Sequence, residues 1–206
     1  MKMNITRLSI IASLMMLFLS INQSAIAAEP ARVQVGIDYH YAIGLADDFN
    51  GHHTSIADQY FAGGYTTVTC LYNINQKFSA GLGAGIGLYS SGDIFTAPIF
   101  GTFRYRPLKN PLKDFYAFTD LGLGLGKEFW NVGPGFLWNI GIGWQKMFRK
   151  HFGINFQIAY NLNDFRRYRA NVESVEHPDY DYYYIITAVP ASDWRHSLAF
   201  GVGLVF

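Results

Sequence analysis

Cysteine and long apolar runs are scarce in this sequence, and each absence excludes a class of protein. The single cysteine, Cys70, cannot form an intramolecular disulfide, which excludes a disulfide-stapled secreted domain. Beyond the N-terminal segment, no stretch is long and apolar enough for a transmembrane helix. The chain must therefore fold without covalent cross-links and without helical membrane spans.

Excess charge of either sign is also lacking once the N-terminal segment is considered. Lys2 and Arg7 precede the apolar run 8–19, and an Ala-x-Ala site follows at 25–27, the three parts of a secretory signal peptide. This pattern predicts cleavage after Ala27, with residues 1–27 as signal peptide and 28–206 as the mature domain. Cleavage removes two of the 16 basic residues and leaves 14 against 15 acidic ones, with no basic excess for nucleic acid.

Alternation with a period of two residues dominates the mature chain. From 194 to 206 every second residue is apolar, except His196, and the residues between them are mostly small or polar. The same alternation predicts strands at 32–46, 60–74, 78–88, 95–106, 115–125, 136–145, 152–163 and 194–206. In the second strand the face with Cys70 is expected to point outward, and 47–59 is expected to be a polar connection.

Two local features concern the third and fourth predicted strands. Ser91-Gly92 predicts a two-residue hairpin that carries the alternation from one strand into the other. Pro98 conflicts with a fully paired strand because it has no N–H to donate, so we expect a bulge there or a shortened strand.

The size of the residues on each face indicates which face points outward. Large apolar residues fill one face of all eight strands, and eight such faces would overfill the interior of an eight-stranded barrel. This argues against a soluble sandwich or lipocalin-like barrel, which hides its large residues inside. The expected fold is an all-β, eight-stranded antiparallel up-and-down transmembrane β-barrel, preceded by a cleaved signal peptide.

Closure of this barrel requires the first and last strands to pair. An open edge in lipid would leave backbone groups without hydrogen-bond partners, at several kcal/mol each. We therefore expect one closed seam, with Val35 or Ile37 beside Phe200 or Val202.

In strand pattern, strand number and the terminal Phe206, the sequence resembles the eight-stranded OmpA/OmpX-like outer-membrane barrels of bacteria. The resemblance implies an outer-membrane protein with periplasmic N- and C-termini and long extracellular loops. It implies a monomer without a cofactor, whose partners are outer-membrane lipid, lipopolysaccharide and, during biogenesis, the barrel-assembly machinery. In that family the closing strand is the assembly signal, which here comprises Phe200, Val202, Leu204 and Phe206.

Polar residues on the inward face are candidates for a functional site. We expect a lumen polar cluster that plugs the barrel, formed by Asp38, His40, Arg104, Asp120, Asn139, Gln157 and Arg195. Because buried charges must be paired, a structural role explains these residues better than catalysis does. No catalytic, cofactor-binding or metal-binding residue is predicted.

Other residues are expected at the membrane interface or beyond it. The predicted aromatic girdle comprises Trp138, Trp144 and Trp194. The longest connection, 164–193, holds Arg166, Arg167 and Arg169, whose planar guanidinium groups suit contact with lipopolysaccharide phosphates. Its tyrosines suit a contact surface for an unknown ligand. The alternative for this segment is that the strands simply continue above the membrane.

The resemblance implies a non-enzymatic role in envelope structure, or in surface interaction and adhesion through the extracellular loops. Two alternatives stay open: a lipid A-modifying enzyme, either an acyl hydrolase or a transferase, and a conduit for small apolar solutes. The lipid A deacylases have His and Ser two residues apart on one face, whereas His196 and Ser197 are neighbours on opposite faces. His52, His53, Ser55 and Asp58 share one segment but match no transferase motif.

Overall fold

The computed structural model describes residues 32–49, 52–55, 62–89, 94–107, 114–126, 134–149, 152–165, 167–177 and 180–206. The predicted signal peptide and the Ser91-Gly92 turn lie outside these residues. Among the described residues, no helix has the length and apolarity needed to span a membrane.

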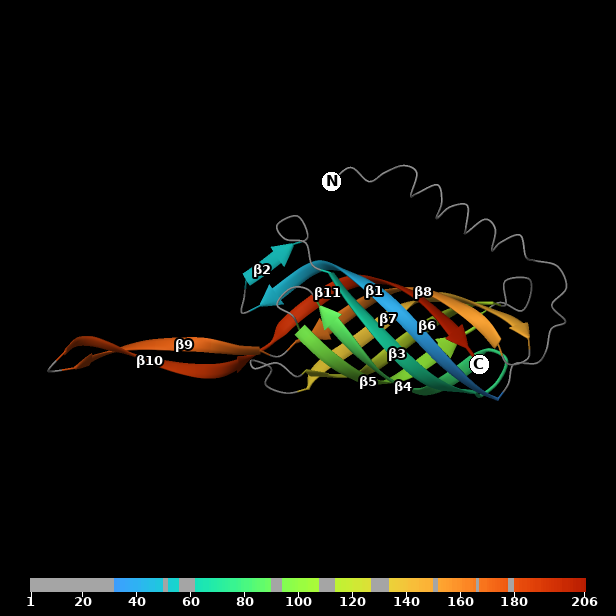
Figure 1. Cartoon of the computed structure of the whole chain (residues 1–206), viewed down its shortest axis with the longest axis horizontal. Helices are drawn as coiled ribbons and strands as arrows, with labels where there is room; N and C mark the ends of the chain where they lie inside the picture. Colours follow the sequence, from blue (N-terminus) through green and yellow to red (C-terminus); the bar gives the residue numbers. More distant parts are fainter. Residues whose placement is uncertain are drawn as a thin grey trace, which may run out of the picture.

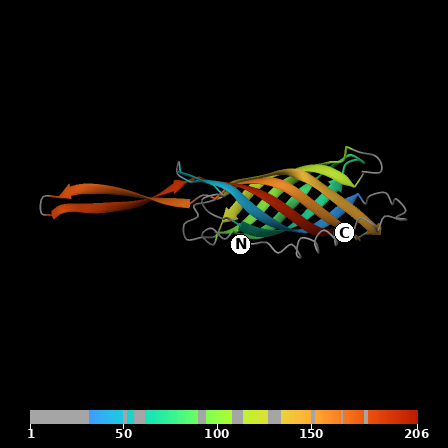
Figure 2. The ribbon, with the colours of Figure 1, turned by 90° about the horizontal axis from the view of Figure 1, so that it is seen from above.

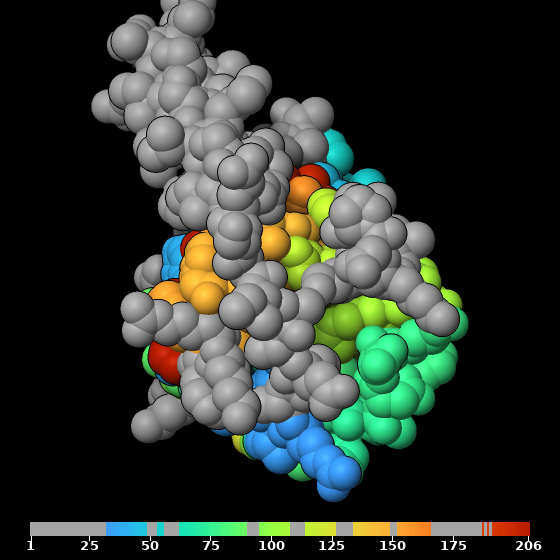
Figure 3. Space-filling model, turned by 90° about the vertical axis from the view of Figure 1, so that its right-hand side faces the viewer, coloured from blue at the N-terminus to red at the C-terminus, as the bar shows by residue number. Residues whose placement is uncertain are grey.

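The elements are all strands: β1 (Val33–Phe49), β2 (His52–Ser55), β3 (Ala62–Asn73), β4 (Phe78–Tyr89), β5 (Ile94–Tyr105), β6 (Phe115–Gly126), β7 (Gly135–Arg149), β8 (Phe152–Asp164), β9 (Arg167–His177), β10 (Tyr180–Ala191) and β11 (Asp193–Val205). Eight of them, β1, β3 to β8 and β11, pair antiparallel in chain order, and β11 also pairs with β1 (Figure 1). Seen from the end that carries the C-terminus, the coloured segments succeed one another around the molecule in chain order (Figure 3). The predicted eight-stranded antiparallel barrel is confirmed.

The seam between β1 and β11 closes the wall. Ile37 pairs with Leu204 across it, and the pairing continues along both strands. The predicted closure is confirmed, but the predicted register, with Val35 or Ile37 beside Phe200 or Val202, was wrong by two residues or more. Alternation along a strand determines which face a residue occupies, whereas the stagger between strands depends on the geometry of the whole barrel.

Side chains alternate between the two faces of the wall as predicted. Large apolar residues stand on the outer surface with 38–72% of their area exposed, for example Leu82 at 72% and Ile142 at 60%. Polar residues such as Asn155, which is fully buried, occupy the inside. Cys70 is exposed, so the outward face of β3 is also the predicted one.

A β-bulge interrupts the alternation near the end of β1. Gly44 pairs with Ser197, but Ala46 already pairs with His196, so Leu45 is an extra residue without a partner of its own on β11. A bulge of this kind shifts the alternation by one position, so the side chains that follow point to the opposite faces of the wall.

The two aspartates after the bulge point to opposite sides of the wall. Asp47 is 9% exposed and faces the interior, whereas the Asp48 side chain is 42% exposed and lies outside. The segment 47–59 was predicted as a connection, and this was wrong for its first part, because β1 continues to Phe49 and pairs there with β2. The carboxylates therefore belong to the barrel wall, and each of them can contact neighbouring strands.

Pro98 causes less disturbance than predicted. Ala84 pairs with Ile99 and Gly87 pairs with Thr96, so the register between β4 and β5 is the same on both sides of Pro98. This is the alignment expected from a two-residue hairpin, and that register is confirmed. The predicted bulge was wrong. The backbone pairing between β5 and β4 is interrupted beside Pro98, which lacks an N–H, while the pairing between β5 and β6 continues.

The segment after β8 is a hairpin rather than an irregular loop. Strands β9 and β10 pair only with each other and extend away from the barrel (Figures 1 and 2). At the base of the hairpin, the Phe165 N–H donates to the Asp193 carbonyl oxygen at 2.8 Å, so the chain leaves and re-enters the wall at one point. The alternative prediction, strands that continue beyond the membrane, is closer to this arrangement, although β9 and β10 form a sheet of their own.

One prediction concerns the close approach of strands at Gly141. A Cβ at this position would overlap the Ile158 carbonyl oxygen and lie 2.8 Å from the Ala159 Cα, so Gly141→Ala is expected to lower the free energy of unfolding by about 1–3 kcal/mol. The matched control is Gly101→Ala, whose Cβ would meet its nearest atoms at 3.9 Å and change stability by less than about 0.5 kcal/mol. Urea titration in detergent micelles measures both, and equal stability of the two variants would contradict the packing described.

Candidate functional site

The polar interior of the barrel is the first candidate site. The seven residues predicted as the lumen polar cluster are all buried, with exposed fractions between 1% for Arg195 and 8% for Asp120. Six of them surround one cavity, namely Asp38, His40, Arg104, Asp120, Asn139 and Gln157, and Arg195 lies outside this group.

A chain of hydrogen bonds connects the part of the cluster nearest the C-terminal end of the wall. The Asn155 amide donates to the Asp38 carboxylate at 2.7 Å, and Tyr116 Oη donates to Asn155 Oδ1 at 2.6 Å. Gln157 Nε2 donates to Tyr116 Oη at 2.8 Å, and Gln157 Oε1 lies 2.7 Å from His40 Nε2. Side chains of β1, β6 and β8 are thus joined across the lumen.

A second chain of side chains continues toward the hairpin end of the barrel. The Asn139 amide donates to Asp120 Oδ2 at 3.1 Å, and Asn161 donates in turn to Asn139 Oδ1. Asn163 donates to Asn161 Oδ1 and to Tyr89 Oη, the latter at 3.2 Å. Because these residues come from four different strands, the network ties opposite sides of the wall together.

Arg195 closes the hairpin end of the interior. Its Nη2 donates to Asp47 Oδ2 at 2.8 Å, and its guanidinium lies over the rings of Phe165 and Tyr89 at 5.2 and 5.9 Å. The bulge in β1 turns Asp47 inward, and this brings its carboxylate within reach of Arg195.

The space that these side chains leave is small. The cavity among them measures about 10 Å³, which is close to the minimum that holds a single water molecule. The side chains around this cavity are therefore closely packed.

Several members of the network were not among the predicted site residues. Tyr116, Asn155 and Asn161 are buried and hydrogen-bonded in the lumen, and their place on the inward face was visible in the alternation. Asp47 was missed because no signal in the sequence marks the bulge that turns it inward.

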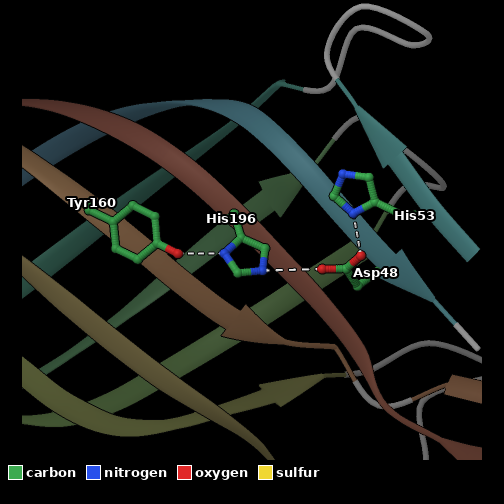
Figure 4. A network of polar contacts seen from close by, with 4 residues as sticks. All are labelled: Asp48, His53, Tyr160 and His196. Atoms are coloured by element: carbon green, nitrogen blue, oxygen red, sulfur yellow. Dashed lines mark hydrogen bonds and ion pairs between the residues drawn. The ribbon is translucent and has the colours of Figure 1, made fainter. Parts of the chain in front are cut away.

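A second cluster lies on the outside of the wall, near the β1–β2 hairpin (Figure 4). His53 Nδ1 lies 2.5 Å from Asp48 Oδ1, and His196 Nε2 lies 3.4 Å from Asp48 Oδ2. The other ring nitrogen of His196, Nδ1, is hydrogen-bonded to Tyr160 Oη. His196 thus projects outward, as the alternation along 194–206 predicts, but it is joined to a carboxylate that the sequence pattern placed in a connection.

The order of hydroxyl, imidazole and carboxylate in this outer cluster is the order of a nucleophile, a base and an orienting group. Catalysis of acyl transfer also needs donors for the developing oxyanion. Tyr160 and His196 stand on β8 and β11, which each have paired neighbours on both sides, so the backbone N–H groups of these two strands are used in hydrogen bonds between strands.

Among the described residues, no group of three His, Cys, Asp or Glu side chains could hold a metal ion.

The predicted girdle and assembly residues lie on the outside of the barrel. Trp138 Nε1 donates to Thr119 Oγ1 at 3.0 Å, Trp144 packs on Phe156, and Trp194 lies 6.2 Å from the Phe136 ring. The proposed assembly residues are exposed on the outer face of β11 or just after it, at 42–50%: Phe200, Val202, Leu204 and Phe206. The Arg166 position lies outside the described residues, and only the backbone of Arg167 and Arg169 is described.

No protein-family model and no curated protein sequence matches this chain. Among solved structures, the outer membrane protein OprG from Pseudomonas aeruginosa is 13% identical, with 88% of this chain and 99% of that chain covered and a TM-score of 0.50. Neisserial surface protein A is 11% identical, with 85% and 99% covered and a TM-score of 0.46. A de novo designed transmembrane β-barrel is 8% identical, with 87% and 97% covered and a TM-score of 0.42.

The likeness to OprG extends over almost the whole of both chains, and at this level of identity it concerns the fold alone. It agrees with the closed antiparallel wall described above. The chain has the fold of the eight-stranded outer-membrane β-barrels.

Proposed function

We propose that this chain is an integral outer-membrane protein that closes its own interior and acts at the cell surface through the parts that project from the barrel. Its role is in envelope structure or in surface interaction and adhesion. The contrast between the closed interior and the projecting hairpin carries the proposal. The lumen is filled by hydrogen-bonded side chains around a cavity of about 10 Å³, whereas the β9–β10 hairpin extends away from the wall.

The proposal includes an orientation, with the hairpin outside the cell and the chain termini in the periplasm. Two of the three connections at the C-terminal end of the wall are short, namely 74–77 and 150–151, and outer-membrane barrels have their short turns on the periplasmic side. In this orientation the arginines after β8 approach lipopolysaccharide phosphates, and the exposed residues of β11 serve as the assembly signal.

The orientation is tested by labelling whole cells with a bulky impermeant thiol reagent. Cys70 is first replaced by serine, and a single cysteine is then introduced at the exposed position Thr187 in β10 or Gln76 in the short turn. We expect Thr187→Cys to react on intact cells and Gln76→Cys to react only after the outer membrane is opened. The reverse pattern would invert the proposed topology.

The surface role is tested by replacing residues 167–191 with a short turn. The hydrogen bond between Phe165 and Asp193 closes the base of the hairpin, so the wall is expected to keep its stability. Attachment of cells to surfaces, or to one another, is expected to fall. Unchanged attachment with a correctly assembled barrel would remove the hairpin from the proposed role.

Two measurements address the alternatives. Planar bilayers with the purified protein are expected to show no conductance steps, and steady steps would indicate an open lumen. Mass analysis of lipid A from cells with and without the protein is expected to show the same acyl pattern. A lost or added acyl chain that depends on Tyr160 or His196 would instead favour the lipid A-modifying enzyme.

A further inference from the structure

The β9–β10 hairpin is a small sheet with two open edges. Among the described residues, β9 and β10 pair only with each other, and the ribbon that they form extends away from the barrel (Figures 1 and 2). An isolated two-stranded hairpin is at best marginally stable in water, and further strands or packing are needed for independent stability. A strand added along one edge would therefore stabilise this hairpin.

Pro190 indicates which edge is available. It lies opposite Tyr168 in the hairpin although it has no N–H, so this pair is of the non-hydrogen-bonded kind, in which the backbone groups of both residues point away from the partner strand. The outer edge of β10 therefore lacks a donor at Pro190, which is typical of an edge that resists further pairing. β9 contains no proline, and its outer edge is the one that suits another strand.

The same pair fixes the direction of the backbone groups along β9. The register between the two strands stays constant as far as Tyr183 and Val175. The N–H and C=O groups of the even-numbered residues in 168–174 therefore point to the open edge. The odd-numbered residues, Arg169 and Glu173 among them, would form the non-hydrogen-bonded pairs with an added strand, in which opposite Cα atoms are closest, at about 4.5 Å.

The charges along β9 select the partner and its direction. Arg167 and Arg169 lie in the half near the barrel, whereas Glu173 and Glu176 lie in the half near the tip. A parallel pairing of two β9 strands would place like charges side by side, which destabilises a sheet. An antiparallel pairing centred on Asn171 instead places Arg169 of each copy opposite Glu173 of the other. A second copy of β9 thus complements the open edge in the antiparallel direction.

We propose that β9 is an adhesion strand that pairs antiparallel with β9 of a second copy of this chain in an apposed outer membrane. Antiparallel pairing requires two hairpins that point toward each other, whereas copies in one membrane project in the same direction. The even-numbered residues exchange the backbone hydrogen bonds, and an Arg169–Glu173 pair lies on each side of Asn171. This inference rests on the proposed function, including the orientation with the hairpin outside the cell, and names the partner of that surface.

The full chain in phosphatidylcholine vesicles tests the partner, because a second copy is then the only protein present. Limited proteolysis of intact vesicles verifies that hairpins are on the outer surface. Vesicles with the protein are expected to cluster, as measured by light scattering, and protein-free vesicles are expected to stay dispersed. Dispersed vesicles of the native chain would overturn the proposal. The proposed function would still stand in that case if removal of the hairpin reduced the attachment of cells to surfaces.

Arg169→Glu and Glu173→Arg test the register. In each variant alone, both Arg169–Glu173 pairs become pairs of like charge, and clustering is expected to weaken roughly tenfold. A mixture of the two kinds of vesicle restores opposite charges, so clustering is expected to return, which also shows that both variants fold. The double variant is expected to cluster by itself. Native clustering of either single variant would overturn the proposal, as would a dispersed mixture.

Asn171→Cys, combined with Cys70→Ser, tests the direction of pairing. Position 171 lies opposite itself in the second copy, so oxidation with copper–phenanthroline is expected to join two copies by a disulfide, including differently tagged copies from separate vesicles. The control is Thr187→Cys, which lies opposite Asn171 within the hairpin and therefore on the side of β9 away from the second copy. Disulfides that form equally in the control, or only between copies in one vesicle, would overturn the proposal.

Discussion

Replacement of Arg195 by leucine is expected to lower the free energy of unfolding by about 3–5 kcal/mol, because the Asp47 carboxylate then stays buried without its partner. Arg195 is 1% exposed, and its Nη2 lies 2.8 Å from Asp47 Oδ2. The substitution also removes the cation that lies over the Phe165 and Tyr89 rings. Urea unfolding of the protein in lipid vesicles, followed by tryptophan fluorescence, measures the change.

A second ion pair in the same wall supplies the control. Lys146 Nζ lies 3.2 Å from Asp114 Oδ2, and both side chains are more than one-fifth exposed. Lys146→Leu is therefore expected to cost at most about 1 kcal/mol, since water screens the charge that remains. The double variant Arg195→Leu with Asp47→Leu leaves no lone charge and should regain part of the lost stability. Equal effects of Arg195→Leu and Lys146→Leu would contradict the buried pair.

Replacement of Ile140 by arginine is expected to cost about 2–4 kcal/mol in a lipid bilayer, because the charge would lie on the lipid face near the middle of the wall, between Trp138 and Trp144. Ile140 is 46% exposed on the outer surface of β7 and pairs with Thr119 on β6 and Tyr160 on β8. The same urea titration in vesicles gives the value, and the loss should be smaller in detergent micelles, which deform around a charge.

The control for this substitution is Gln76→Arg, in the exposed turn between β3 and β4. It adds the same charge outside the apolar belt and is expected to leave the free energy of unfolding within about 0.5 kcal/mol. If Ile140→Arg were as stable as Gln76→Arg in vesicles, the outer face of β7 would not be in contact with lipid, and the membrane assignment would fail for this part of the wall.

Much of the barrel wall could be predicted because the sequence pattern that indicates a strand is local. In a strand the side chains alternate between faces, so the residues of one face can be read from the sequence without knowledge of any partner strand. The number of barrel strands, the outward face of Cys70 and the alignment across the β4–β5 hairpin follow from this rule and from the turn length. The polar interior follows from the same alternation, which placed six predicted residues around one cavity.

Features that depend on contacts between distant residues could not be predicted in this way. The register of the seam is one of them, since alternation is equally well satisfied by a shift of two residues. The hairpin β9–β10 is another, because pairing between its strands competes with pairing to the wall, and periodicity alone does not distinguish the two.

The strands, their outward and inward faces and the polar character of the lumen follow from the sequence alone, because each of them depends on the period of the β-strand. The position of the carboxylates at the end of β1 depends instead on the assembled barrel. The bulge at Leu45 depends on how β1 aligns with β11, and it turns Asp47 inward to Arg195, 148 residues away, and Asp48 outward to His196. A contact over such a separation depends on the closed barrel, in which the first and last strands become neighbours.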